Sequence, residues 1–409
     1  MTAFIIEHQC PQCGAPAELE ETDRLFQCGY CRVKSCLDVP GPLQYILPHR
    51  APSGKELIYF PYWRFKGMLF YCLPGEIKNR FVDFSMQAIA SPDFPFSLGL
   101  RTQTQKLRFA IKECEGLFLP PELPKAELIA DLHERFSAEI PKPILHQAQI
   151  GETISILYAP FYLDTRLVDA ILNRPVGNIT AEAIAPLLTK AQAPQWSLTF
   201  LSTLCPQCGW DLEADKNALV LNCANCRSTW RPKGGKLEAL KSAHVPAPGP
   251  EGLYLPFWRI QCDIAGVTLD NYADLIRLAN LPRVAQPGDQ QRPFYFWCPA
   301  FKVRPQNFLT FAAQATTCQV REEILTGPPP GQLHSVNLPL QEAVESLILT
   351  FAGFARPKQH MEEILKNIRI QARSALLVYL PFEESPHEFI RPVMNLAIAK
   401  NLLKLAKNL

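Results

Sequence analysis

Eight of the fourteen cysteines form two cassettes with the same spacing, which is the spacing of ligands around a tetrahedral metal ion. The cassettes are Cys10, Cys13, Cys28 and Cys31, and then Cys205, Cys208, Cys223 and Cys226. Both begin CPQCG, both have fourteen residues between their inner cysteines, and they lie 195 positions apart. Two CxxC pairs on facing turns can place four thiolates about 2.3 Å from a d10 ion. The sequence therefore predicts two structural Zn²⁺ ions per chain.

The residues around each pair favour the tight turns that the ligands need. In CPQCG the proline restricts φ between the two cysteines, and Gly14 and Gly209 supply a permissive backbone after the second one. We expect Gly29 to do the same in the distal pair of the first cassette. Apolar residues before Cys28 and Cys223 predict a β-hairpin leading into each distal turn. The cassettes resemble zinc ribbons, and a pair of disulfides or a rubredoxin-like iron centre are the alternatives.

The other six cysteines share no ligand-like spacing, so we expect them to be core or surface thiols. They are Cys36, Cys72, Cys114, Cys262, Cys298 and Cys318. Cys36 follows Cys31 closely, but its counterpart in the second cassette is Arg231, which argues against a fifth ligand. The chain has no basic and apolar N-terminal leader and no apolar run of 18 residues, so it is expected to be cytoplasmic. Thiols in that compartment stay reduced or bind metal.

The repetition continues beyond the cysteines. YFPYWR at 59–64 recurs as YLPFWR at 254–259, again 195 positions apart. Further on, Leu100 and Arg101 align with Phe301 and Lys302, and YAPF at 158–161 aligns with YLPF at 379–382 at an offset of 221. Two copies with so long a period indicate a duplicated unit and not a solenoid.

Length and composition predict several domains. A chain of 409 residues is too long for one compact core. The expected domains are a zinc ribbon at 1–39, an α+β domain at 43–193, a second ribbon at 198–233 and a second α+β domain at 246–409. Loops rich in proline at 40–42 and 246–250 suggest that each ribbon is hinged. The 38 prolines are nearly twice the usual share of about 5% and favour short helices.

Periodicity gives a coarse set of elements. Strands are predicted at 57–73, 97–111, 153–163, 252–268, 294–303 and 374–382. Helices are predicted at 125–140, 181–191, 269–280, 306–316, 340–354, 358–370 and 389–409. Because the two types are interspersed without regular alternation, the predicted fold class is α+β, with each ribbon followed by an aromatic- and proline-rich domain.

Two segments outside the cassettes have both a structural and a functional interpretation. Tyr59, Tyr62, Trp63 and Arg64 can stack bases or hold an anion, or else they pack a core with Pro61 at an edge or bulge. The run at 389–409 is predicted to be a basic amphipathic helix that carries Lys400, Lys404 and Lys407 along one face. Such a helix covers its own domain, lies on an anionic membrane or docks into a partner's groove.

Catalysis and nucleic-acid binding are both disfavoured. The chain lacks a P-loop, a GxSxG elbow and an HExxH motif, and all-cysteine metal sites leave no open position for water. Lysine and arginine number 41 against 39 acidic residues, and acidic residues outnumber basic ones in the first ribbon. Because affinity for phosphate backbones comes mainly from lysine and arginine, nucleic-acid binding is possible but not favoured.

The CPxCG and CxxC turns followed by a Y-x-P-[FY]-W segment, at 59–63 and 254–258, resemble the bacterial TFIIB-type zinc-ribbon protein family, here in tandem. The resemblance covers about a third of the chain. It implies zinc binding, and an association of some members with membrane-stress systems. A helicase label given to some relatives does not transfer, because no motor motif is present. The leading hypothesis is a non-enzymatic adaptor with a protein partner. The alternatives are a nucleic-acid-binding module and a peripheral membrane protein that binds through 389–409.

Overall fold

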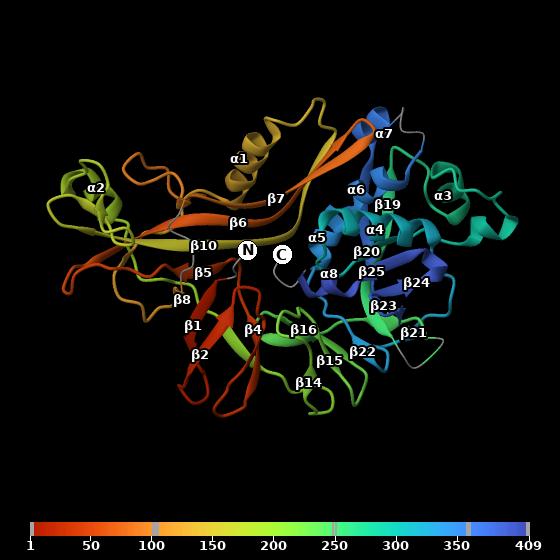
Figure 1. Cartoon of the computed structure of the whole chain (residues 1–409), viewed down its shortest axis with the longest axis horizontal. Helices are drawn as coiled ribbons and strands as arrows, with labels where there is room; N and C mark the ends of the chain where they lie inside the picture. The colour runs from red at the N-terminus through yellow and green to blue at the C-terminus, as the bar shows by residue number, and fades with distance from the viewer. Residues whose placement is uncertain (1–3, 100–105, 248, 250–251, 357–360, 406–409) are drawn as a thin grey trace.

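The chain is a mixed α and β protein in which two units lie side by side, with the two cysteine-rich ribbons packed together below them (Figure 1). The computed structural model describes residues 4–99, 106–247, 249, 252–356 and 361–405. Their strands are arranged in four sheets. Among these residues, no helix combines the length and the apolar character needed to cross a membrane.

The first unit is built on three long strands. The central strand β6 (Leu57–Leu73) pairs with β10 (His146–Leu163) on one side and β7 (Glu76–Gln87) on the other. Nearly every residue of β6 is buried because both faces are covered. Leu69 and Tyr71 pack under helix α1 (Lys125–Ser137), whereas Met68 and Phe70 pack into the core of the second unit. A continuous apolar run of this kind is the expected pattern of a strand that is buried on both faces.

Shorter strands extend this sheet, on one side as far as the first ribbon. They are β1 (Ile5–Gln9), β2 (Pro16–Glu20), β5 (Leu43–Ile46), β8 (Lys106–Phe109), β9 (Leu117–Phe118), β11 (Leu167–Asp169) and β12 (Arg174–Pro175). The path from one edge to the other runs β12-β11-β10-β5-β8-β1-β2. Helix α2 (Ala181–Leu188) follows β12 along the chain. The N-terminal hairpin of the first ribbon is therefore part of the large sheet, because β1 pairs in parallel with β8.

The second unit is built on the same kind of hairpin. Its strands are β18 (Ser242–His244), β19 (Leu253–Ala265), β20 (Phe296–Pro299), β21 (Leu325–Thr326), β22 (Gln332–Leu333), β23 (Arg369–Glu384), β24 (Glu388–Arg391) and β25 (Leu396–Ala399). Its helices are α3 (Tyr272–Leu278), α4 (Pro305–Cys318), α5 (Leu340–Glu345), α6 (Leu347–Phe354), α7 (Met361–Asn367) and α8 (Lys400–Leu405). Helices α5 and α6 pack on the first unit, where Glu342 accepts hydrogen bonds from the N–H groups of Gly151 and Glu152.

Strand registers in the two units agree position by position. Tyr158 lies opposite Pro61, and Tyr379 lies opposite Pro256. Parallel strands flank both hairpins: β5 and β18 pair with β10 and β23, and β9 and β22 pair with β6 and β19. The equivalences at offsets 195 and 221 thus describe matched positions in space.

The predicted alignment of Leu100 and Arg101 with Phe301 and Lys302 needs a correction. Ala88 and Ala300 donate backbone hydrogen bonds to the carbonyls of Pro61 and Pro256, at 3.0 and 2.9 Å. Phe301 therefore corresponds to the residue after Ala88, so its predicted alignment with Leu100 is wrong. Leu100 and Arg101 themselves lie outside the described residues. The second unit has extra residues around α3, which lie between β19 and β20 and therefore before Ala300. Counting positions from the cysteines does not show where these extra residues lie.

The C-terminal helix prediction is wrong. Residues 388–399 form the antiparallel hairpin β24–β25, with Phe389 opposite Ile398, and within the described part of 389–409 the α-helix is limited to Lys400–Leu405. Pro392 opens a short 3-10 turn, and Asn395 adopts a left-handed φ of 49°, so the chain reverses direction where the helix was expected. Leu396 and Ile398 are buried by the alternation of the strand. Lys400 contacts Glu384, and Lys407 lies outside the described residues.

Other predicted elements are present with different limits. The strand expected at 97–111 is shown only at Lys106–Phe109, and part of that range lies outside the described residues. The helix expected at 340–354 is divided at Ser346 into α5 and α6. The helix expected at 358–370 is described only as Met361–Asn367, because β23 begins at Arg369.

The two ribbons share strands with each other and with the first domain. The second hairpin of ribbon 1, β3 (Leu25–Gln27) and β4 (Lys34–Asp38), is completed by β13 (Thr199–Ser202), which begins ribbon 2. Ribbon 2 continues as β14 (Leu212–Glu213), β15 (Leu221–Cys223), β16 (Thr229–Lys233) and β17 (Lys236–Ala239). The hairpin predicted to lead into each distal turn occurs as β14–β15 in ribbon 2. In ribbon 1 that prediction is wrong, because β2 and β3 belong to different sheets.

Candidate metal centres

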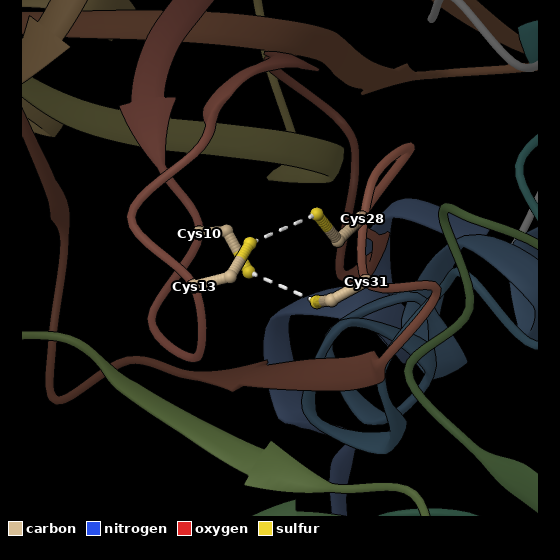
Figure 2. A group of neighbouring side chains, drawn as sticks. All are labelled: Cys10, Cys13, Cys28 and Cys31. Carbon is tan, nitrogen blue, oxygen red and sulfur yellow. Dashed lines mark hydrogen bonds between the residues drawn. The ribbon is translucent and has the colours of Figure 1, made fainter.

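Each cysteine cassette brings four sulfur atoms together from two facing turns. Figure 2 shows the first group, in which Cys10 Sγ lies 3.7 Å from Cys31 Sγ and Cys13 Sγ lies 3.7 Å from Cys28 Sγ. In the second group the Cys205–Cys226 and Cys208–Cys223 Sγ distances are 3.6 and 3.5 Å. Within each group all four sulfurs lie within 4.8 Å of one another.

These distances fit a bound metal ion and do not fit disulfides. A tetrahedron with metal–sulfur bonds of about 2.3 Å has sulfur–sulfur edges of about 3.8 Å. A disulfide has a sulfur–sulfur bond of about 2.05 Å, and the cysteines of both groups are free. The eight predicted ligands are therefore brought together in the two predicted groups of four.

Backbone conformation explains how each turn presents its sulfurs. Gly14 and Gly209 both have φ of 73°, in the left-handed region, and their N–H groups bond to the carbonyls of Cys10 and Cys205. The prediction for Gly29 is wrong, because the left-handed residue in the distal turns is Arg32 in ribbon 1 and Arg227 in ribbon 2. Arg32 N–H bonds to Cys28 O at 3.1 Å. The turn places its strained residue just after the second cysteine in every pair.

Backbone N–H groups also favour the thiolate form of a ligand. The pKa of the Cys28 thiol is lowered to about 6, mainly by the N–H of Cys31, with a further contribution from Tyr30. Tyr30 N lies 3.4 Å from Cys28 Sγ. A thiolate is the form of cysteine that binds metal, so the turn prepares this residue for its role as a ligand.

Burial divides each centre into an inner and an outer half. Cys10, Cys28, Cys205 and Cys223 are buried, whereas the second cysteine of each pair is at least partly exposed. Four thiolates complete a tetrahedral coordination shell, and such a site offers no position for a reacting water. The geometry therefore suits metal ions that hold the turns together.

Cys36 is a core thiol and not a fifth ligand, as expected, but its position between the two ribbons was not predicted. It belongs to neither group of four but lies on β4 opposite Leu201 of β13. There it packs with Cys205, Leu221 and other residues of ribbon 2. Burial raises the pKa of its thiol to about 11, so Cys36 is a neutral core residue between the two ribbons. The other cysteines outside the cassettes are likewise in neither group.

The aromatic segment after each ribbon is part of the core. Tyr59 and Trp63 pack on the face of β6 that α1 covers, and Tyr62 packs on the opposite face. Trp63 Nε1 donates to Leu123 O at 2.8 Å, and the equivalent Trp258 donates to Leu338 O at 3.0 Å. Arg64 is also buried, bound to Glu21 of ribbon 1 and to Asp83 of β7. Sequence reasoning missed this ion pair, because Glu21 resembles the surface acidic residues around it.

Comparison of the chain with protein-family models, with curated proteins and with solved structures finds no match. The case for a function therefore depends on the two centres and on how the ribbons are joined to the rest of the molecule.

Proposed function

We propose that this protein is a non-enzymatic scaffold whose two ribbons are each stabilised by a structural zinc ion. The observation that carries the proposal is the pairing of β13 with β4, which places a strand from the start of ribbon 2 in the sheet of ribbon 1 and so ties the two four-cysteine centres together. A small ribbon obtains much of its folding free energy from its metal. Because each ribbon also contacts the unit beside it, the two ions hold the relative positions of both units.

The rest of the sequence favours zinc over iron as the bound metal. Iron in a four-cysteine site serves electron transfer, and no other redox motif occurs in the sequence. Metal analysis of the purified protein should give two zinc ions per chain. A Cys10→Ser, Cys13→Ser double variant should retain one, and the Cys205→Ser, Cys208→Ser variant should also retain one. Retention of both ions by either variant would contradict the ligand assignment, and a visible thiolate-to-iron absorption band would contradict zinc.

We also propose that the scaffold consists of two copies of a ribbon-plus-domain unit. Supporting this proposal are the matched strand registers and the equivalent hydrogen bonds of Trp63 and Trp258. A chain with two related units joined through their ribbons presents two similar surfaces in a fixed relationship, which suits an adaptor in a protein assembly.

Native affinity purification tests the adaptor role. The zinc-loaded chain should retain a defined set of proteins, and the Cys205→Ser, Cys208→Ser variant should lose them. If single- or double-stranded nucleic acid binds instead, with an affinity that falls steeply with salt concentration, the adaptor role is wrong and the nucleic-acid alternative is right.

A further inference from the structure

A cavity lies between ribbon 2 and the second unit, and we call it the ribbon 2 pocket. Residues of β14, β15 and the distal turn of ribbon 2 form one wall, and residues 328–336 with Tyr379 of β23 form the other. Its volume is about 590 Å³, within the range of about 300–1,000 Å³ that ligand pockets usually have. The pocket is therefore large enough for a small ligand or for a few residues of polypeptide.

The wall that contains Leu333 has a matched counterpart in the first unit. Phe118 lies opposite Tyr59, and Leu333 lies opposite Tyr254, in parallel pairs of strands at equivalent positions. The residue after Phe118 and the residue after Leu333 each donate a backbone hydrogen bond to the carbonyl of that tyrosine, at 3.1 and 2.9 Å. The space beside this wall can therefore be compared between the two units.

The first unit fills this space with part of its own chain. Gln192 N–H donates to Phe118 O at 2.9 Å, and the segment QAPQW at 192–196 lines the space that remains beside Phe118 and Tyr158. That space is about 100 Å³, against about 590 Å³ in the ribbon 2 pocket. Within the described residues, Leu333 O accepts no bond equivalent to the one from Gln192. The second unit thus leaves open a space that a proline-containing segment occupies in the first.

The hydroxyl group of Tyr379 is a hydrogen-bond donor buried at this pocket. Tyr379 is 1% exposed, and Asn222 Nδ2 donates to its Oη at 3.2 Å. Thr229 Oγ1 orients Asn222 by donating to Asn222 Oδ1 at 2.9 Å. With Asn222 as the donor, the proton of the Tyr379 hydroxyl has no acceptor among the described residues. Because an unpaired buried donor costs free energy, a ligand that supplies an acceptor here gains affinity.

The equivalent tyrosine of the first unit already has an acceptor. Tyr158 Oη donates to Gln44 Oε1 at 3.4 Å. By strand register the counterpart of Gln44 is Ser242, whose shorter side chain bonds instead to Thr229 at 2.7 Å. The open space and the unused hydroxyl donor therefore occur together, in the second unit.

The walls of the pocket are held in place by contacts within the protein. Pro328, Pro329 and Pro330 follow one another, so their φ angles are restricted and these three residues offer no N–H groups. Leu219 N–H of ribbon 2 donates to Val336 O at 2.8 Å, which joins the two walls. Because little has to be ordered on binding, a short ligand loses little of its affinity to that cost.

We propose that the ribbon 2 pocket binds a short, proline-containing peptide segment of a partner protein, in the position that residues 192–196 occupy in the first unit. A backbone N–H of the segment donates to Leu333 O, as Gln192 donates to Phe118 O. A carbonyl of the segment accepts from the Tyr379 hydroxyl. This inference rests on the proposed adaptor function and specifies the chemistry of its partner.

The test uses the full-length, zinc-loaded protein and fluorescence-polarisation titrations with three labelled peptides. The first has the sequence of residues 190–198, KAQAPQWSL. The second carries an N-methyl group on the backbone nitrogen of its first glutamine, and the third has the same composition in a different order. The first peptide should bind, because the chain's own segment fills the equivalent space of the first unit and leaves the ribbon 2 pocket open. The N-methyl peptide lacks one donor and should bind at least about threefold more weakly, and the reordered peptide should not bind.

Matched variants locate the site. Tyr379→Phe keeps the ring but removes the hydroxyl, so it should weaken binding of KAQAPQWSL about two- to tenfold, the effect of one hydrogen bond. Tyr158→Phe makes the same change at the equivalent position of the first unit and should leave the affinity unchanged. Ala214→Trp adds a bulky side chain at an exposed position that lines the pocket and should lower the affinity at least about tenfold. Each variant should retain two zinc ions, which shows that its ribbons are folded.

The proposal is overturned if KAQAPQWSL does not bind, if the reordered peptide binds equally well, or if Tyr158→Phe weakens binding as much as Tyr379→Phe does. It is also overturned if Ala214→Trp leaves the affinity unchanged, and that result does not depend on the hydroxyl group. None of these results would change the zinc content of the wild type or its co-purification with partner proteins, so the docking site and the adaptor function are tested separately.

Discussion

Arg64 in β6 donates a hydrogen bond to Glu21 of ribbon 1, and the two side chains are 5% and 1% exposed. Lys66 also lies 3.8 Å from Glu21, whereas the second carboxylate bound by Arg64, that of Asp83, is 40% exposed. The loss of its partner is far more costly for a charge in the interior than for a charge at the surface. The pair therefore fixes ribbon 1 on its domain.

Replacement of Glu21 should be much more damaging than replacement of Asp83. Glu21→Gln removes the one fully buried carboxylate beside Arg64 and Lys66 and should lower the free energy of unfolding by about 3–5 kcal/mol. Asp83→Asn should cost about 1 kcal/mol or less, because water can compensate for the loss. Urea unfolding of the zinc-loaded proteins measures both values. Equal effects would mean that the two carboxylates contribute equally, which would contradict the dominant role of the buried Glu21.

The glycines after the proximal cysteines should not tolerate a side chain. Gly14→Ala and Gly209→Ala force an L-residue into the left-handed region and should each cost about 1–2 kcal/mol of ribbon stability. Gly29→Ala is the control, because its φ lies outside that region and an added Cβ meets nothing within 4 Å. Competition with a chelator for zinc, followed by thermal unfolding, should rank Gly29→Ala with the wild type. A large effect of Gly29→Ala would contradict the assignment of the turn.

Trp63 and Trp258 should contribute equally to stability if the two units are equivalent. Trp63→Phe and Trp258→Phe each keep a buried ring but leave the carbonyl of Leu123 or Leu338 without its donor. The loss of such a bond costs about 1–3 kcal/mol. Matched decreases in the midpoint of urea unfolding are expected. An unchanged midpoint with loss of bound partner would instead favour a ligand-binding role for these segments.

Acid should destabilise the first unit through two histidines, His133 in α1 and His146 at the start of β10. Burial lowers the pKa of His133 and His146 from the ordinary value of about 6.5. The folded protein consequently binds fewer protons than the unfolded chain below that pH. Stability from this source is present above pH 6.5 and is lost as pH falls below it.

A pH series of unfolding measurements from 7.5 to 5.5 checks this expectation. His133→Gln, His146→Gln should have a flatter profile than the wild type, and His387→Gln, an exposed control, should follow the wild type. Because all three proteins share the same metal centres, proton competition at the cysteines cancels in the comparison. Identical profiles for the double variant and the wild type would rule out the histidines as the source.

Local chemistry made some features predictable from the sequence. The two groups of four cysteines are indicated by spacing and residue type, and β6 was predicted at its observed limits because most of its seventeen residues are aromatic or aliphatic. The matching registers of Pro61 with Tyr158 and of Pro256 with Tyr379 were also indicated by the repeated short motifs at these positions. These features depend on residues close together in the chain.

Features that depend on distant contacts were not predictable. At 389–409 the helical spacing of leucine and alanine is real, but pairing of β24 with β23 and the turn at Pro392 override it. Gly29 was predicted to take the left-handed conformation in the distal turn, yet Arg32, three residues later, takes it. Three further contacts join segments that no sequence motif connects. They are the pairing of β13 with β4, the packing of Cys36 between the ribbons and the Arg64–Glu21 hydrogen bond.

The strand that ribbon 2 contributes to ribbon 1 sets the order in which the ribbons can fold during synthesis. Ribbon 1 can bind its metal soon after its last cysteine leaves the ribosome, but β4 must wait for Thr199–Ser202 before its sheet is complete. At about 5–20 residues per second, that delay is on the order of 10–30 s. During this interval an incomplete sheet edge is exposed to other nascent chains. We expect a metal ion bound to ribbon 1 to hold β4 in position during this interval, until Thr199–Ser202 pairs with it.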